Sequence, residues 1–356
     1  MKILIIVDSL KYGGAEKQAV IDANSLIDCG HHVTIAYYKK GDLMKLLAKG
    51  VNQYQIKSKN LSLASLQIFF HLLLNRYDIV HSHMFWAEII SALPGKLTGH
   101  RVVFNEHGLE LWRRWYHILI MKFASLFADK IITSCEATKE VRIKRGKLNK
   151  NKLLTIYNSF NIIKEEKREI YIPDFLNKKE NFIIGFVGRF NQVKRLEIFI
   201  DVAEYLRNVI PKFKIVLVGD GKEKDKINRE IENKNLGRYF YLPGYILNIG
   251  QYYKEFDVFV LPSIREACSI ALLEAGASGI PAIAFDVGGN PEIIKDGITG
   301  FIIPNNDIAL LIRKIIYFYK NNQKRYKMGL VARNYIKNKF SEAKRLYKLT
   351  NLYKER

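Results

Sequence analysis

Short runs of apolar residues alternate along the chain with longer segments in which apolar residues recur at helical spacing. Several of the short runs are apolar and β-branched at almost every position, as expected of parallel strands that are buried on both faces. Strands that alternate with helices in this way indicate a parallel sheet covered by helices. In the first half of the chain we predict strands at 2–7, 32–38, 78–84, 102–108, 130–136 and 153–158, with helices at 15–29, 61–75 and 109–128.

A polar and charged segment interrupts this alternation near the middle of the chain. It contains Pro173 and has no clean period, so we place a linker at 166–181, between a first domain at 1–165 and a second at 182–340. The tail, 341–356, is amphipathic and basic, and we expect a final helix that packs back on the first domain. In the second domain we predict strands at 182–187, 214–218, 239–242, 258–261, 281–285 and 301–303.

Length and composition exclude several classes of protein. The chain has 356 residues, more than one ordinary core holds, and its 48% hydrophobic and 26% charged residues are a globular composition. The longest apolar stretches, 61–74 and 118–128, are too short or too interrupted to span a bilayer. The apolar start of the chain is typical of a buried strand rather than a signal peptide. Three cysteines without paired spacing indicate a reducing compartment and no structural zinc site.

The charge of the chain narrows the choice of partners. Lys and Arg number 57 against 35 Asp and Glu, a formal net charge of +22. Such an excess favours nucleic acid, an anionic membrane face or phosphorylated substrates, although a lysine-rich surface without a specific partner explains it equally well. Seven basic residues and one acidic residue lie in 139–152. Upstream, Trp112, Arg113, Arg114 and Trp115 suit a membrane interface or an ordinary half-buried helix, and we favour the second for Trp115.

Ligands of open parallel sheets bind at the carboxyl ends of the strands, so the residues after each strand are candidates for chemistry. After the first strand, Gly13 and Gly14 precede a helix. Two adjacent glycines let the backbone approach a ligand, and a simple tight turn is the alternative. Neither this loop nor 219–224 matches G-x-G-x-x-G, and G-x-x-x-x-G-K-[ST] is absent from the sequence. A dinucleotide dehydrogenase and a P-loop protein are therefore disfavoured.

The second half has charged residues at the same kind of position. Arg189 and Lys194 follow a strand, and a planar fork beside a point charge suits a diphosphate, unless both are ordinary surface cations. Glu266 follows another strand, and Glu274 lies in a predicted helix, 269–279, whose other members are apolar or small. A buried carboxylate needs a partner, either a protein cation or the hydroxyls of a ribose or sugar. The free N–H groups at the start of this helix suit a phosphate.

These residues together resemble the family 4 glycosyltransferases of the GT-B fold. The most specific part of the resemblance is the pair Glu266 and Glu274, with seven residues between them. The resemblance implies an α/β protein in which two Rossmann-like domains face each other across a cleft. The other matching motifs are Gly13-Gly14-Ala15-Glu16, His81-Ser82-His83, Glu106-His107-Gly108, Gly188-Arg189 with Lys194, Val218-Gly219-Asp220-Gly221, Pro243-Gly244-Tyr245 and Gly288-Gly289-Asn290-Pro291-Glu292.

The resemblance implies a role for each matching residue. Arg189 and Lys194 would bind the donor diphosphate and stabilise it as it leaves, and Glu266 would hold the hydroxyls of the transferred sugar. Glu274 would take the ribose hydroxyls, and His107 would face the sugar as a hydrogen-bonding group or a base. Further donor-binding positions would be Gly13, Gly14, Gly188, Tyr245 and the backbone of Cys268, Ser269 and Ile270, and acceptor-side positions would be Glu16, His83 and Glu106.

The family transfers sugars with retention and without a metal that bridges the diphosphate, so the resemblance implies neither a metal nor a cofactor. No D-x-D motif occurs in the sequence. His81, His83 and His107 suggest a zinc site, but no acidic or thiol ligand accompanies them at metal spacing. The family has Gly or Pro and bulky apolar residues after the first glutamate, where this chain has Ala267 and Cys268, a difference that bears on sugar preference.

The function implied is a retaining glycosyltransferase. It would move a hexose-type sugar from a nucleotide diphosphate sugar, with UDP favoured over GDP, to a glycan or an undecaprenyl-diphosphate-linked glycan in the synthesis of cell-surface polysaccharide or lipopolysaccharide. We expect it in the cytoplasm, peripheral on the inner face of the cell membrane and in contact with the anionic surface. Two alternatives are a nucleotide-sugar epimerase or hydrolase on the same architecture, and a basic nucleic-acid-binding or anion-binding protein. The glutamate pair argues against the first, and the absence of a recognised basic-aromatic module against the second.

Overall fold

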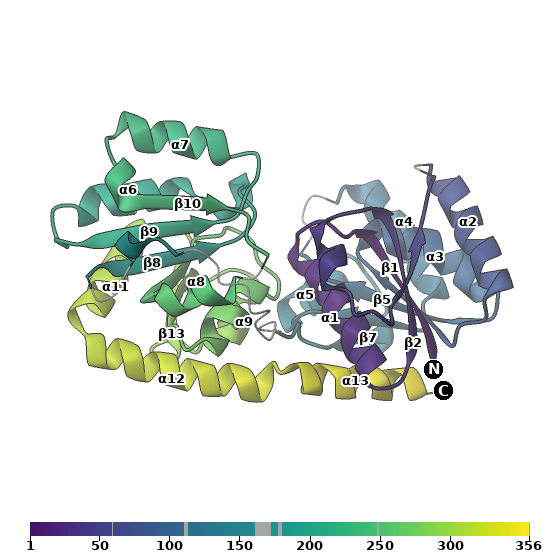
Figure 1. Cartoon of the computed structure of the whole chain (residues 1–356). Coiled ribbons are helices and arrows are strands. Elements are labelled where there is room, and N and C mark those ends of the chain that lie inside the picture. Colours follow the sequence, from purple (N-terminus) through teal and green to yellow (C-terminus); the bar gives the residue numbers. More distant parts are fainter. Residues whose placement is uncertain (59, 110–112, 161–171, 177–179, 248, 356) are drawn as a thin grey trace. The chain divides into compact units, whose positions relative to one another are not determined.

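The computed structural model describes residues 1–58, 60–109, 113–160, 172–176, 180–247 and 249–355. The chain forms two compact units, unit 1 from Met1–Ser159 with Glu342–Arg356 and unit 2 from Phe160–Ser341 (Figure 1). Most of the predicted linker, 166–181, lies outside the described residues. Within the described ranges, no helix has the length and apolar character needed to cross a membrane.

Unit 1 is built on a parallel sheet in the strand order β3-β2-β1-β4-β5-β6-β7. Ile5 in β1 lies opposite Ile35 on one side and His81 on the other, and residues 3–7 of this strand are 0% exposed. The apolar run at the start of the chain is therefore a central strand, buried on both faces. The strands are β1 Lys2–Ser9, β2 His32–Lys39, β3 Asn52–Gln55, β4 Ile79–His83, β5 Arg101–Glu106, β6 Lys130–Thr133 and β7 Leu153–Thr155.

Helices cover both faces of this sheet (Figure 1). Helices α2, α3 and α4 pack on the face that bears Val80 and Val102, which lie opposite each other in register. Helix α13, from the end of the chain, packs against α1 and bonds to His81, which alternates with Val80 and so faces the other way. The helices are α1 Gly14–Asp28, α2 Leu61–Leu74, α3 Phe85–Leu97, α4 Trp115–Phe127, α5 Glu136–Lys144 and α13 Glu342–Lys354.

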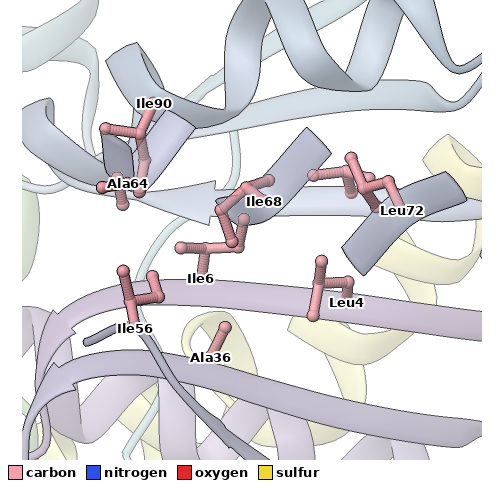
Figure 2. Close-up of a cluster of buried hydrophobic side chains, with 10 residues drawn as sticks. Leu4, Ile6, Ala36, Ile56, Ala64, Ile68, Leu72 and Ile90 are labelled. Carbon is pink, nitrogen blue, oxygen red and sulfur yellow. The ribbon is translucent and has the colours of Figure 1, made fainter. Parts of the chain in front are cut away.

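The core under α2 shows how this helix is attached to the sheet (Figure 2). Ala64, Ile68 and Leu72 recur every four residues and form one stripe that packs over Leu4 and Ile6 of β1. All five side chains are 1% exposed or less. The helix therefore uses one narrow stripe for the core, and its other apolar residues point elsewhere.

Unit 2 repeats the plan with a parallel sheet in the order β10-β9-β8-β11-β12-β13. In both sheets the first strand of the unit, β1 or β8, is flanked by strands whose connections run in opposite directions, and ligands bind at such a switch point. The strands are β8 Phe182–Val187, β9 Phe213–Val218, β10 Phe240–Gly244, β11 Val258–Leu261, β12 Ala282–Phe285 and β13 Gly300–Ile303. The helices are α6 Glu197–Leu206, α7 Lys224–Asn233, α8 Gly250–Glu255, α9 Ile270–Ala277, α10 Asn290–Ile293, α11 Ile308–Lys320 and α12 Asn322–Lys339.

The predicted α/β class with two parallel sheets is confirmed, and every predicted strand overlaps an observed one. The pattern missed β3, Asn52–Gln55, because this short polar edge strand has no apolar run. The helix predicted at 109–128 is shorter, since α4 begins at Trp115, and Trp112 lies outside the described residues. The half-buried interpretation of Trp115 was wrong: it is 72% exposed, because it lies about 180° around α4 from the buried Ala124.

Candidate functional site

The loops at the carboxyl edge of the unit 2 sheet are tied to one another by backbone hydrogen bonds. The Gly188 N–H donates to the carbonyl of Val218 (3.0 Å), and the Gly219 N–H donates to the carbonyl of Gly244 (2.9 Å). These bonds connect the ends of β8, β9 and β10. The three loops therefore hold fixed positions before any ligand arrives.

The loops after β8, β11 and β12 are joined in the same way. The Ile264 N–H donates to the carbonyl of Val193 (3.0 Å), and the Gly289 N–H donates to the carbonyl of Glu266 (3.3 Å). The segments that carry Lys194, Glu266 and the 288–292 turn thus lie together, although they are far apart in the sequence.

Two glycines after β9 are required by the close approach of the loop after β8. Gly219 and Gly221 have φ of 145° and 153°, a backbone conformation that favours glycine. A Cβ on Gly219 would lie 1.9 Å from the carbonyl oxygen of Gly188, and one on Gly221 would lie 2.2 Å from that of Phe190. The 218–221 motif is therefore explained by the packing of two backbone loops.

Lys194 and Glu266 meet at this edge. The Lys194 Nζ lies 2.5 Å from Glu266 Oε1, and the two side chains are 18% and 10% exposed. Lys194 ends a 3₁₀ turn, Gln192–Lys194, after β8, and Glu266 lies between β11 and α9. Arg189 is exposed on the same loop as Lys194. The structure thus places two of the four predicted catalytic side chains in contact and another, Arg189, on the loop that carries Lys194.

Glu274 lies inside unit 2 on α9. Its carboxylate is 4% exposed and accepts a hydrogen bond from the phenol of Tyr253 (3.1 Å), which lies on α8. Burial, followed by the nearby Glu274 charge, raises the pKa of Tyr253 well above its ordinary value, so the phenol is a neutral donor. The sequence indicated that Glu274 needs a partner, but nothing in the pattern of α8 singled out Tyr253.

The start of α9 offers backbone groups. Ser269 caps the helix, since its hydroxyl accepts from the Leu272 N–H (3.4 Å). The three residues here are buried: Cys268, Ser269 and Ile270 are 5%, 7% and 6% exposed. The first N–H groups of a helix have no partner within the helix, which suits the predicted backbone contacts. Tyr245 follows β10 and is partly buried.

In unit 1, the glycine loop leads from β1 into α1. Gly13 is the N-cap of α1, and its carbonyl accepts from the Lys17 N–H (2.9 Å), while Gly14 is exposed. The Glu16 carboxylate accepts from the Ser9 hydroxyl (3.3 Å) and so joins the first turn of α1 to the end of β1. These residues lie at the carboxyl edge of the unit 1 sheet.

His83 and His107 form a hydrogen-bonded pair at the same edge of unit 1. His83 Nδ1 lies 2.8 Å from His107 Nε2, and the two rings stack with centroids 5.0 Å apart. Burial lowers the pKa of His107 to about 3, so the ring is neutral at ordinary pH. His107 Nδ1 is buried and has no hydrogen-bond partner among the described residues. Two ring nitrogens of the pair, His107 Nδ1 and His83 Nε2, therefore lack a partner among the described residues.

Helix α13 contributes buried polar side chains to this region. The phenol of Tyr353 lies 2.6 Å from His81 Nδ1, and the rings of His81 and His83 have centroids 4.4 Å apart. The Arg345 guanidinium donates to both carboxylate oxygens of Asp22 on α1, at 2.6 and 2.7 Å. No motif in the sequence points to Tyr353, Arg345 or Asp22, because no local pattern relates the two ends of the chain.

The carboxylate of Glu106, a predicted acceptor-side residue, is bound by two arginines inside unit 1. Glu106 is 0% exposed. It accepts from Arg113 at both oxygens (3.0 Å each) and from Arg142 at Oε2 (2.9 Å). The two guanidinium groups outweigh burial and lower the pKa of Glu106, so the charge is neutralised inside the protein. Arg142 belongs to the basic segment 139–152, which is therefore only partly a solvent-exposed surface.

Two further carboxyl groups lie near this edge and were missed. Asp8 Oδ1 accepts from the Ala87 N–H (3.1 Å), and burial raises the pKa of Asp8 to about 7. Glu88 is 0% exposed, and neither of its oxygens has a hydrogen-bond partner in the described part of the chain. Burial raises the pKa of Glu88 well above its ordinary value. Glu88 is thus a buried carboxyl group on α3 whose ionised form is disfavoured.

Over the described ranges, no group of three or more His, Cys, Asp or Glu side chains is placed to hold a metal ion. His83 and His107 bind each other through ring nitrogens, and His81 binds Tyr353, so these nitrogens are already engaged.

Comparison with known proteins matches both halves of the chain to glycosyltransferase families. Residues 167–335 match the family described as "Glycosyl transferases group 1", and residues 12–162 match "Glycosyltransferase Family 4". A UDP-Gal:alpha-D-GlcNAc-diphosphoundecaprenol alpha-1,3-galactosyltransferase of Escherichia coli is 30% identical over 292 residues, 78% of this chain and 75% of that protein. The capsular polysaccharide biosynthesis glycosyltransferase CapM of Staphylococcus aureus is 25% identical over 79% of this chain and 77% of that protein.

Solved structures extend the similarity to the fold of the whole chain. The crystal structure of Anabaena Alr3699/HepE in complex with UDP-glucose matches with a TM-score of 0.85 over 99% of both chains, at 20% sequence identity. At this identity the match shows a shared fold.

Proposed function

Since this chain belongs to the family 4 glycosyltransferases and has their GT-B fold, we propose that it moves a hexose-type sugar from UDP, with retention, to a glycan or lipid-linked glycan acceptor. The match to transferases speaks against the two alternatives, an epimerase or hydrolase and a nucleic-acid-binding protein. The relative that acts on a diphosphoundecaprenol-linked acceptor supports the lipid-linked choice.

The observation that carries the proposed donor site is the contact between Lys194 and Glu266 at the carboxyl edge of the unit 2 sheet. Lys194, together with Arg189, would bind the diphosphate and stabilise the negative charge that develops as the nucleotide leaves. Glu266 would accept from hydroxyls of the transferred sugar. Each charge neutralises the other, so neither is left as an unpaired ion in this largely buried position.

The remaining donor contacts follow from α9 and its neighbours. The helix N-terminus, with the backbone of 268–270, would bind phosphate oxygens. Glu274 accepts from Tyr253 and has further acceptor capacity for ribose hydroxyls, since a carboxylate has several lone-pair sites. Tyr245, with Gly188, would lie beside the nucleotide, and Gly13 and Gly14 at the start of α1 are further proposed donor-binding positions.

His107 is proposed to bind the sugar through a hydrogen bond. Its depressed pKa makes the ring a weak base, and its Nδ1 is a buried polar atom without a partner among the described residues. A sugar hydroxyl would satisfy that atom. His83 fixes the ring by its bond to Nε2, and Glu16 remains the acceptor-side candidate from the glycine loop.

The chain is further proposed to work in the cytoplasm on the inner face of the cell membrane, in the synthesis of cell-surface polysaccharide. A net charge of +22 favours an anionic lipid surface. A lipid-linked acceptor would be presented there.

The proposal is tested by ligand-induced thermal shifts. The purified protein is heated with UDP, GDP and their common sugar conjugates, alongside Glu274→Ala and the matched surface variant Glu232→Ala on α7. We expect UDP compounds to raise the melting temperature of the wild type and of Glu232→Ala, and to have a weaker effect on Glu274→Ala, because a ligand stabilises only the form that binds it. A folded wild type that responds to no nucleotide would refute the donor site, and a response to GDP alone would replace UDP as the donor nucleotide.

A further inference from the structure

Three neighbouring helices of unit 1 expose an unusual number of large apolar side chains. The apolar face is defined here by Leu66, Phe70 and Leu74 of α2, Leu97 of α3, and Leu119 and Phe123 of α4. Their exposed fractions are 48%, 54%, 85%, 66%, 56% and 61%. Isolated exposed apolar residues are normal on soluble proteins, but a continuous set over several elements marks an interaction surface.

The three helices form one layer. Helix α2 packs beside α3, and α3 packs beside α4, on the same side of the unit 1 sheet (Figure 1). Their inward-facing apolar residues, such as Ala64, Ile68 and Leu72 in α2, pack in the core (Figure 2). The apolar face is therefore additional to the core residues and lies on the outer side of the layer.

The charged residues around this face distinguish between its possible binding partners. The only acidic residue in α2, α3 and α4 is Glu88, which is 0% exposed. The exposed charges within the helices are Lys96 and Lys122, both basic. Arg76 follows α2 and Arg114 precedes α4, while the exposed Asp78 lies two residues beyond Arg76. Lys96 is paired with Asp129 just beyond α4, at 3.2 Å. The face is thus apolar with a basic margin.

We propose that the apolar face inserts into the headgroup region of an anionic lipid bilayer. This proposal rests on the proposed function in one respect, that the acceptor is lipid-linked. Apolar side chains enter the acyl boundary while the basic margin binds lipid phosphates. The exposed Trp86 and Trp115, 37% and 72%, suit the same depth, since tryptophan favours the membrane–water interface. Helix α2, about 21 Å long at 14 residues, lies on the bilayer rather than across it.

A second copy of the chain fits the face less well than a bilayer. In a two-fold dimer the same patch meets itself, so the basic margin of one copy would lie against that of the other. Like charges brought together in this way repel, and no exposed carboxylate on the three helices is present to compensate. A bilayer with anionic headgroups supplies the opposite charge at the required place.

The test measures vesicle binding without donor or acceptor. The full chain is floated with vesicles of phosphatidylcholine alone and with vesicles that contain equal amounts of phosphatidylcholine and phosphatidylglycerol. Phe123→Glu and Leu97→Glu place a charge on the apolar face at positions that are already exposed, so folding is retained. Tyr326→Glu, at 66% exposure on α12 of unit 2, is the matched control for Leu97, also 66% exposed.

We expect the wild type and Tyr326→Glu to float with the anionic vesicles, and each variant of the apolar face to bind at least tenfold more weakly. UDP-induced thermal shifts of all four proteins are expected to be equal, so a failure of the donor site is distinguished from a failure of the surface. Equal flotation of all four proteins, or no flotation of the wild type, would overturn the proposal. So would a dimer of the wild type in solution that both Glu variants of the apolar face convert to monomer.

Discussion

Lys194 illustrates how a single side chain obtains its chemistry from its neighbours. Its ammonium group lies 2.5 Å from Glu266, and its side chain is 18% exposed, in a loop whose position is fixed by backbone bonds to other loops. A cation held in place in this way stabilises a leaving diphosphate without having to reorganise during the reaction. A surface lysine without these neighbours would be a solvated charge.

Replacement of this side chain should affect the chemical step. Lys194→Met is expected to lower kcat/KM for sugar transfer by about 100- to 1,000-fold, the loss usually seen when one preorganised charge-stabilising group is removed. The measurement is UDP release in the presence of donor and acceptor. Lys226→Met, at a position on α7 that is 57% exposed, serves as the control and should retain wild-type activity. Wild-type kcat/KM in Lys194→Met would contradict the assigned role.

Asp8 gives a pH-dependent prediction. Its pKa rises from 3.8 to about 7 on folding, so between these values the folded chain holds a proton that the unfolded chain has lost. The Asp8 term therefore makes the free energy of unfolding fall as pH rises from about 4 to about 7. Asp8→Asn, which keeps the acceptor for the Ala87 N–H, removes this term.

Urea unfolding at several pH values checks the sign. Relative to the wild type, Asp8→Asn should gain stability as pH rises through this window and show a constant difference above it. Asp28→Asn, at an exposed position on α1, should follow the wild-type curve. A stability difference for Asp8→Asn that shrinks as pH rises would show that the pKa is not raised.

At the scale of elements, α13 stands out because it completes unit 1 from the far end of the chain. Arg345 donates to Asp22 on α1 and to the carbonyls of Ile156 and Tyr157, at 3.1 and 3.0 Å. Tyr353 reaches His81 on β4. One amphipathic helix thus satisfies a buried carboxylate, two backbone carbonyls and a ring nitrogen close to the His83–His107 pair.

Loss of this contact should destabilise unit 1. Arg345→Met leaves Asp22 as a buried charge that has lost its cation, and the expected cost is about 3–5 kcal/mol of unfolding free energy. Urea unfolding with hydrogen exchange locates the effect, with lost protection in α1 and β4 rather than in unit 2. Tyr347→Phe, at 68% exposure on the same helix, should change little. A loss confined to unit 2 would contradict the structural account of α13.

At the scale of the whole molecule, the net charge of +22 is the dominant property. Some of the basic groups are paired inside the units, as Arg113 and Arg142 are with Glu106, but most remain on the surface. Excess charge of one sign destabilises the compact state through self-repulsion and attracts anionic surfaces. Both effects weaken as salt screens the charges.

Salt should therefore change two properties in opposite directions. Raising the sodium chloride concentration is expected to raise the melting temperature of the free protein, because repulsion among surface cations is screened. The same change should weaken flotation with vesicles that contain phosphatidylglycerol. A melting temperature that falls steadily with salt would show that attractive ion pairs, and not net repulsion, dominate the surface.

The sequence by itself determined the elements, the α/β class and the positions of Lys194, Glu266 and Glu274 after or near their strands. These depend on period, turn chemistry and helix caps, which are local in the chain. Only the tertiary structure decided that Arg113 and Arg142 neutralise Glu106, that Tyr253 binds Glu274, and that the outer sides of α2, α3 and α4 form one apolar face. Arg345 and Asp22 are 323 positions apart, and such a pair is fixed by the packing of a finished fold, which no local pattern encodes.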